Sequence, residues 1–163
     1  MTEQQKIMRD VADVDVPDVL QNLVSYRIRL LQIASYKAFE QKVTGFGQAP
    51  RYFGMLKLIE ANPGIPQTRL AEAIFLDRSS LVPILEALTR EGWVERKSAP
   101  QDKRVRRVFL TVEGQDRLAD LEKAATAHES IFTAGLAGHE KAQLLTLLEK
   151  LGDNLRKVYA AGE

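Results

Sequence analysis

Cysteine is absent from the 163 residues of the sequence. A chain without cysteine has no disulfide framework, no cysteine zinc site and no thiol that senses oxidants. Long apolar runs are also absent, since no stretch approaches the roughly 20 apolar residues that a membrane-spanning helix needs. Residues 1–16 include four acidic side chains and no continuous apolar run, so we expect neither a signal peptide nor a membrane anchor. These absences predict a cytoplasmic protein.

Recognisable catalytic motifs are missing as well. The sequence has no Gly-rich phosphate loop, nucleophile elbow, metal-binding helix or paired catalytic carboxylates. His128 and His139 lie eleven residues apart beside glutamates, a spacing more typical of solvated helix residues than of a metal site. We therefore expect no enzymatic activity, no metal and no cofactor.

Net charge is close to zero, at +1, which by itself gives little reason to expect a nucleic-acid partner. The distribution of charge is more informative. Residues 90–107 contain seven basic and three acidic side chains, a local charge of +4, so the rest of the chain is net acidic. A basic stripe on a near-neutral body is an electrostatic footprint for a polyanion.

Apolar spacing predicts a mainly helical fold with a small β-hairpin. Helices are expected from Pro17 to about Val43, over 51–61, from Pro66 and Gln67 through Ile74, over 78–91, from Thr111 onward, and over 139–159. Strands are expected at 93–97 and 105–110, joined by a polar tip. We divide the chain into a tail and dimerisation helix (1–45), a winged helix-turn-helix lobe (46–111) and C-terminal dimerisation helices (112–163).

The two terminal helical regions carry apolar stripes that need a partner. In the last helix the stripe comprises Leu144, Leu148, Leu151, Leu155 and Val158. In the first it comprises Leu20, Val24, Leu31, Ala34 and Ala38. The simplest way to bury both is to pack them against each other and against a second copy of the chain, so we expect a homodimer.

The middle block has the organisation of a DNA-binding motif. A short helix, a connection at Phe75 and Leu76, and a second helix capped by Asp77 leave the start of the second helix projecting, where it fits a DNA major groove. The hairpin that follows, called the wing, carries basic residues to an adjacent minor groove or its phosphates. The residues expected to contact DNA are Arg69, Arg78, Ser79, Ser80, Val82, Lys103, Arg104 and Arg106.

Several of these residues also have a purely structural interpretation. A serine pair after aspartate commonly caps a helix, and a basic hairpin is often a solvated surface. Asp102 at the wing tip would repel phosphate, so we expect it to brace Arg104 or another basic residue by a charge-assisted hydrogen bond. The ordered combination of these features, rather than any one of them, predicts DNA binding.

The same residues resemble the MarR family of bacterial winged-helix regulators from about residue 18 to 158. The resemblance is carried by Leu70-Ala71-Glu72, Leu76-Asp77-Arg78-Ser79-Ser80-Leu81, Leu85-Glu86-Ala87-Leu88, Glu91-Gly92-Trp93-Val94, Asp102-Lys103-Arg104 and Leu110-Thr111-Val112-Glu113-Gly114. It implies a homodimer that represses transcription from a pseudo-palindromic operator, often near its own gene. It also implies that Arg78, Ser79 and Ser80 lie at the major groove and Arg104 in the minor groove.

The chain departs from the family pattern at two places. Val82-Pro83 replaces a common Thr-Arg pair, so one base-reading arginine is missing. Pro83 costs about 3 kcal/mol inside a helix and is tolerable only in its first turn or two. Phe75 replaces a glycine in the turn, and we expect its ring to pack inward and alter the angle between the two helices.

The resemblance further implies release from DNA by a small anionic, often aromatic or acyl-thioester, ligand. Arg27 lies within the apolar stripe of the first helix, where a buried guanidinium needs an anionic or carbonyl partner, either a ligand or a structural ion pair in the dimer. An aromatic cluster nearby either lines a pocket or belongs to the core. The candidate ligand residues are Arg27, Tyr36, Phe39, Phe46, Arg51, Tyr52 and Phe53.

Two other functions fit a winged helix. The chain would act as a regulator without a ligand, or as a module that contacts protein instead of DNA. The basic wing tip argues against the protein-interaction module, because its charge suits a polyanion.

Overall fold

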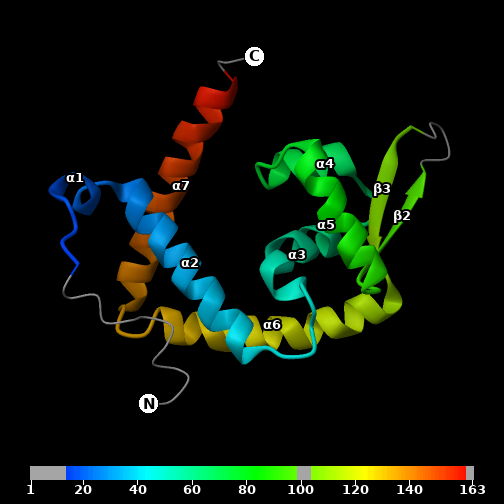
Figure 1. Cartoon of the computed structure of the whole chain (residues 1–163), viewed down its shortest axis with the longest axis horizontal. Helices are drawn as coiled ribbons and strands as arrows, with labels where there is room; N and C mark the ends of the chain where they lie inside the picture. The colour runs from blue at the N-terminus through cyan, green and yellow to red at the C-terminus, as the bar shows by residue number, and fades with distance from the viewer. Residues whose placement is uncertain (1–13, 99–103, 161–163) are drawn as a thin grey trace. The chain divides into compact units, whose positions relative to one another are not determined.

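A computed structural model describes residues 14–98 and 104–160 (Figure 1), and the chain divides into two compact units between Thr126 and Ala127. The second unit holds the end of α6 (Val112–Phe132) and α7 (Gly138–Ala160). The first holds α1 (Asp18–Gln21), α2 (Val24–Lys42), the 3-10 turn η2 (Ala49–Tyr52), α3 (Phe53–Ala61), β1 (Ile65–Pro66), α4 (Gln67–Ala73), α5 (Arg78–Arg90), β2 (Val94–Ser98), β3 (Arg106–Leu110) and the larger part of α6. The expected mainly helical fold with a hairpin is confirmed.

Within the described residues, no helix is both long and apolar enough to cross a membrane.

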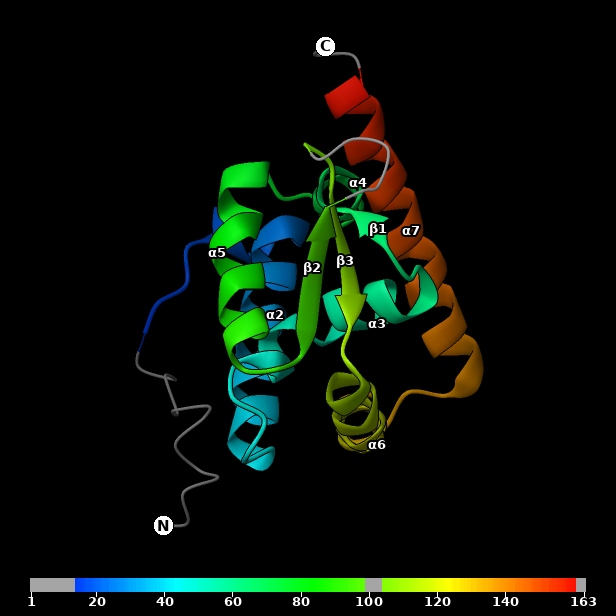
Figure 2. The same cartoon turned by 90° about the vertical axis from the view of Figure 1, so that its right-hand side faces the viewer.

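The sheet has three antiparallel strands in the order β1-β3-β2 (Figure 2). β2 and β3 form the predicted hairpin, with Val94 opposite Leu110 and Ser98 opposite Arg106. β1 was not predicted. It pairs only Ile65 with Val108 and Pro66 with Arg107 on the outer side of β3, and a two-residue strand containing proline leaves no alternating pattern in the sequence.

The hydrophobic core of the first unit lies where α3, α4, α5 and α6 meet the sheet. The spacing of Leu81, Leu85 and Leu88 places them on one face of α5, and all three are fully buried. Side chains from the other elements complete this core, including Leu56, Ile59, Leu70, Trp93, Val94, Val108, Leu118 and Leu121. Packing of this density fixes the relative positions of α4, α5 and the wing.

The base of the wing is joined tightly to α6. The hydroxyl oxygen of Thr111 accepts a hydrogen bond from the backbone N–H of Gly114 at 2.8 Å, which caps α6. A Cβ on Gly114 would lie 2.1 Å from the carbonyl oxygen of Trp93, so only glycine fits this position. The guanidinium of Arg117 lies 4.1 Å from the centre of the Trp93 ring. The wing therefore projects from a rigid base.

The helix predicted from Pro17 to Val43 is broken into α1 and α2, so the single long helix is wrong. The amide of Asn22 donates to the carbonyl of Asp18 at 2.9 Å, and Leu23 has an extended backbone. Asparagine competes with backbone donors in this way and favours helix ends over helix interiors. The helix predicted over 51–61 likewise begins as the 3-10 turn η2, before the regular α3.

Phe75 does not pack inward as expected. Its side chain is 56% exposed, and its φ of 55° lies in the left-handed region that glycine adopts readily. The residue thus keeps the backbone conformation of a glycine turn while its ring faces solvent.

We expect Phe75→Gly to change the free energy of unfolding by less than about 1 kcal/mol, because glycine relieves the backbone but also makes the unfolded chain more flexible. Phe75→Val should destabilise the protein by about 1–2 kcal/mol, since a β-branched residue fits this backbone region poorly. Chemical denaturation measures both. A loss near 3 kcal/mol in Phe75→Gly would instead show that the ring is part of the core.

Apolar side chains on the terminal helices remain exposed in the single chain. All five leucine and valine positions of the predicted α7 stripe are at least 38% exposed, and on an ideal helix they lie within an arc of about 80°. Further exposed apolar residues follow α1 and α2, among them Val19, Leu23, Val24, Ile28 and Leu31. Contiguous apolar surface of this kind marks interaction sites.

Candidate nucleic-acid interface

The connection between α4 and α5 brings the first turn of α5 to the surface. The backbone N–H of Leu76 donates to the carbonyl of Ala71 at 2.9 Å, and the left-handed Phe75 reverses the chain. Leu70 on α4 and Leu81 on α5 are both fully buried and anchor the two helices in one core. This arrangement is the predicted helix-turn-helix, with Arg78, Ser79 and Ser80 at its exposed end.

Asp77 caps α5, as the sequence predicts. Its carboxylate accepts a hydrogen bond from the backbone N–H of Ser80 at 2.8 Å. The hydroxyls of Ser79 and Ser80 also donate to it, at 2.5 and 2.8 Å. Hydrogen bonds to the ionised form, the Ser79 hydroxyl first, lower the pKa of Asp77 from its ordinary value of 3.8 to about 2.

These bonds define what the serine pair does in the unbound chain. Both hydroxyl protons are directed to Asp77, so the structural interpretation of the pair as part of a helix cap is correct. Their hydroxyl oxygens still offer acceptor lone pairs, and their contact with DNA stays a prediction.

Acid should weaken the α5 cap through Asp77. Because the folded-state pKa lies below the ordinary value, this stabilisation is complete above pH 3.8 and is lost as the pH falls toward about 2. We expect Asp77→Ala to lower the midpoint of thermal unfolding at neutral pH. Asp77→Asn should keep the capping acceptor but lose this acid dependence. Melting curves of the three proteins over this pH range test the assignment, and parallel pH profiles for wild type and Asp77→Asn would contradict it.

Pro83 is the sixth residue of α5 and therefore lies in its second turn, the region where it was expected to be tolerated. It has no N–H to donate to the carbonyl of Ser79, so α5 loses one backbone hydrogen bond near its exposed end. Val82, the predicted base-contacting residue before it, is partly buried. The departure from the Thr-Arg pattern therefore places short apolar side chains where a long cation is common.

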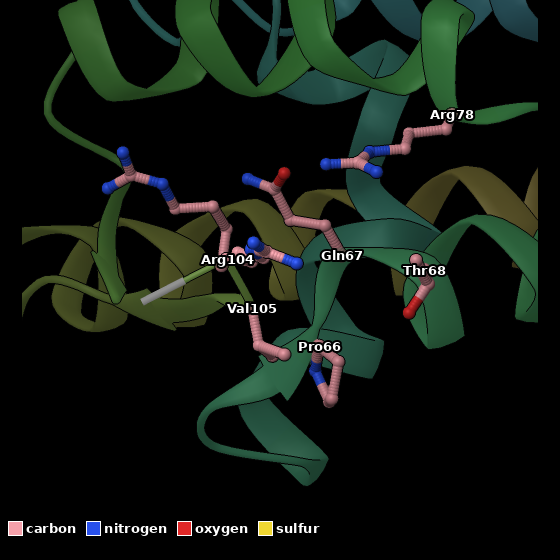
Figure 3. Close-up of a pocket in the computed structure, with 7 residues that line it drawn as sticks. Pro66, Gln67, Thr68, Arg78, Arg104 and Val105 are labelled. Atoms are coloured by element: carbon pink, nitrogen blue, oxygen red, sulfur yellow. The ribbon is translucent and has the colours of Figure 1, made fainter. Parts of the chain in front are cut away.

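Three arginines, one from α5 and two from the wing, line one pocket. Arg78 begins α5, Arg104 precedes β3 and Arg106 begins β3, and the pocket between them has a volume of about 170 Å³. Figure 3 shows Arg78 and Arg104 on opposite sides of the Gln67 side chain. The complete lining is Pro66, Gln67, Thr68, Arg78, Arg104, Val105 and Arg106. The structure thus brings predicted residues of the helix and of the wing into one site.

Gln67 is the buried polar residue of this site that the sequence does not reveal. The sequence marks it only as the start of a helix, yet it is 6% exposed. Its burial results from packing between α4 and the wing, which apolar spacing does not reveal. The only sequence signal was a polar residue directly after Pro66, at a helix start facing a basic hairpin.

The other residues predicted to contact DNA lie in different surroundings. Arg69 is exposed and forms an ion pair with Glu72 at 2.7 Å. The guanidinium of Arg106 donates to the hydroxyl of Ser98 across the hairpin at 3.1 Å. Lys103 and the proposed brace Asp102 lie outside the described residues.

The candidate ligand residues belong mostly to the core. Phe39 is 6% exposed and Phe46, Tyr52 and Phe53 pack against the core cluster, whereas Tyr36 is 40% exposed. This arrangement favours the interpretation of the aromatics as core residues.

The two candidate ligand arginines are both exposed. Arg51 pairs with Glu40 at 3.3 Å. Arg27 is not buried in the single chain, contrary to expectation, because the α1–α2 break lets its Nε donate to the carbonyl of Gln21 at 3.1 Å. No group of three or more His, Cys, Asp or Glu side chains placed to hold a metal occurs in residues 14–98 and 104–160.

Comparison with known proteins agrees with this geometry. The model of the MarR family matches residues 50–105. A Thauera aromatica protein assigned as the transcriptional regulatory protein for the hcr operon is 34% identical over 129 residues, 78% of each chain. The transcriptional repressor CouR, solved with a 23-mer DNA duplex, is 30% identical with a TM-score of 0.76, covering 85% of this chain and 99% of that one; CouR has also been solved with p-coumaroyl-CoA. The PcaV regulator of Streptomyces coelicolor, solved with its natural ligand, is 28% identical with a TM-score of 0.75, covering 86% and 98%.

Proposed function

Because this chain belongs to the MarR family of transcriptional regulators, we propose that it represses its own gene and a neighbouring operon by occupying a pseudo-palindromic operator as a homodimer. Proteins of this family are DNA-binding transcription factors rather than enzymes. The operator would be released when a small anionic ligand binds. A protein that acts on the bacterial chromosome would work in the cytoplasm.

The convergence of Arg78, Arg104 and Arg106 carries the proposal. These cations come from the start of α5 and from the wing, the two elements that reach a major groove and the adjacent minor groove in a winged helix. None of the seven residues lining their pocket is acidic. The surface that connects helix and wing therefore suits a polyanion better than a protein partner of mixed charge.

The exposed stripe on α7 supports the homodimer. Two copies of one apolar stripe are self-complementary about a two-fold axis. A two-fold dimer presents two α5 helices and two wings to DNA, which matches a palindromic operator. The exposed apolar residues of α1 and α2 are a second surface that a partner copy could cover.

For the effector we propose an aromatic carboxylate or its acyl thioester. The structure of CouR with p-coumaroyl-CoA supports this class, since CouR is 29% identical to this chain. Arg27 and Arg51 are the cations that we propose for such a ligand, and both are exposed on α2 and η2. A thermal-shift screen with aromatic acids and acyl thioesters tests the class, because a ligand of the folded state raises the melting temperature.

DNA binding is tested by mobility shift with the region upstream of the protein's own gene, or with duplexes selected from a random pool. We expect a specific complex whose affinity falls steeply with added salt, as counterion release requires. Failure to retain any duplex at low salt would favour the protein-interaction module instead.

A further inference from the structure

Gln67 places a buried polar group among the three arginines. Its side chain is 94% buried, and its Nε2 has no hydrogen-bond partner within the described residues. A buried donor without a partner costs roughly 1–3 kcal/mol, so most buried polar groups in proteins are satisfied. Figure 3 shows this amide between Arg78 and Arg104. The site therefore has an unused donor in a pocket that three arginines line.

The chemistry of the lining selects an anion with several acceptor atoms. Guanidinium groups bind carboxylate or phosphate through paired N–H donors, and the Gln67 amide adds a neutral donor from within the pocket. About 170 Å³ is several times the roughly 30 Å³ that one water occupies, which is room for one small oxyanion. Pro66 and Val105 supply the apolar part of the wall.

We propose that this pocket, lined by Gln67, Arg78, Arg104 and Arg106, seats one phosphate-type oxyanion, and that the occupant in the complex is a single DNA backbone phosphate. The inference rests on the proposed DNA binding. A phosphate held between α4, α5 and the wing would fix the wing relative to the start of α5. It would set the register of the protein on DNA without reading sequence.

Gln67→Leu tests the pocket because it removes the donor and leaves an apolar side chain of similar size. We expect about 100-fold weaker binding to a selected duplex, because each of two subunits loses a hydrogen bond to a charged group that is worth about tenfold, with unchanged base preference. The melting temperature should not fall, since an unsatisfied buried amide has been removed. Gln67→Glu should weaken binding further than Gln67→Leu, because a carboxylate repels the phosphate and pairs with the arginines.

The matched control is Gln115→Glu, the same charge change at an exposed position of α6. It should stay within about twofold of wild type, as expected of a charge distant from the phosphates. Wild-type affinity for Gln67→Leu, with Gln67→Glu no weaker than this control, would overturn the phosphate pocket while leaving DNA binding intact. Loss of binding by the wild-type protein itself would instead overturn the proposed function.

Two further measurements identify the source of the phosphate. A duplex series with one neutral methylphosphonate per position should contain a position in each half-site that weakens wild type about tenfold and Gln67→Leu clearly less, because the variant keeps the arginines but lacks the amide donor. Calorimetry with inorganic phosphate should show weak binding that is weaker still in Gln67→Leu. Binding of inorganic phosphate that depends on Gln67, without any such duplex position, would support the oxyanion site but assign it to free phosphate. If neither duplex binding nor phosphate binding depends on Gln67, the oxyanion site is refuted.

Discussion

Leu148→Glu is expected to convert the protein to a monomer and to weaken operator binding by about 100-fold or more. The side chain lies in the exposed apolar stripe of α7 and is 40% exposed in the single chain. In a two-fold dimer the interface would contain two of these new carboxylates, one from each subunit. Burying an unpaired carboxylate is strongly unfavourable. Two monomers would then bind the two half-sites independently, without the gain in affinity that comes from joining two DNA-binding lobes in one dimer.

Analytical ultracentrifugation and fluorescence anisotropy with a selected duplex measure the two effects. Thr146→Glu is the matched control, because it puts the same carboxylate on the same helix about 160° away from Leu148. We expect this control to remain dimeric and to bind DNA normally. A dimeric Leu148→Glu protein would show that α7 does not form the interface.

Arg104→Ala is expected to weaken operator binding by about 100-fold, since each of two wings would lose a contact of about 1–3 kcal/mol. The dependence of log affinity on log salt should become shallower by about two, one phosphate per wing. Arg104 is exposed and directly precedes β3, so its loss should leave the fold and the melting temperature unchanged. Base preference set by α5 should persist.

Arg90→Ala is the matched control for the wing, because it removes one exposed arginine at the far end of α5 from Arg78. An affinity change equal to that of Arg104→Ala would show a general charge effect rather than a wing contact. Arg104 lies both on the wing and in the lining of the phosphate pocket, so this variant alone does not separate the two roles. The Gln67 variants separate them, because Gln67 is not on the wing.

The elements of the DNA-binding lobe could be predicted because local signals agreed with one another. Apolar spacing placed α5, Asp77 marked its start, and Gly92, with a φ of 78°, marked its end. The same spacing predicted the α7 stripe, which the fold leaves exposed. Where the apolar spacing, the helix cap and the helix-ending glycine all indicate the same boundaries, the local sequence is sufficient to predict the helix.

The features that escaped prediction depend on contacts between elements distant in sequence. The pairing of Pro66 with Arg107 spans 41 residues and creates β1 without any strand pattern. Burial of Gln67 follows from the wing folding against α4, so a polar residue at a helix start gave no indication of it. At Phe75 the turn requires a positive φ, and in this conformation the phenyl ring is exposed, although aromatic side chains are usually buried. For Arg27 the helix break, set by Asn22, supplied a backbone carbonyl in place of an anion.

Strand β1 also protects one edge of the sheet from aggregation. An exposed sheet edge normally offers backbone donors to which another chain adds a strand, which is a common route to aggregation. Here Pro66 has no N–H, and the N–H of Ile65 already donates to the carbonyl of Asn62 at 3.0 Å. The outer edge of β1 therefore has no backbone donor to offer a foreign strand. Within the described residues the sheet ends at three strands, and growth into larger β-assemblies from this edge is disfavoured.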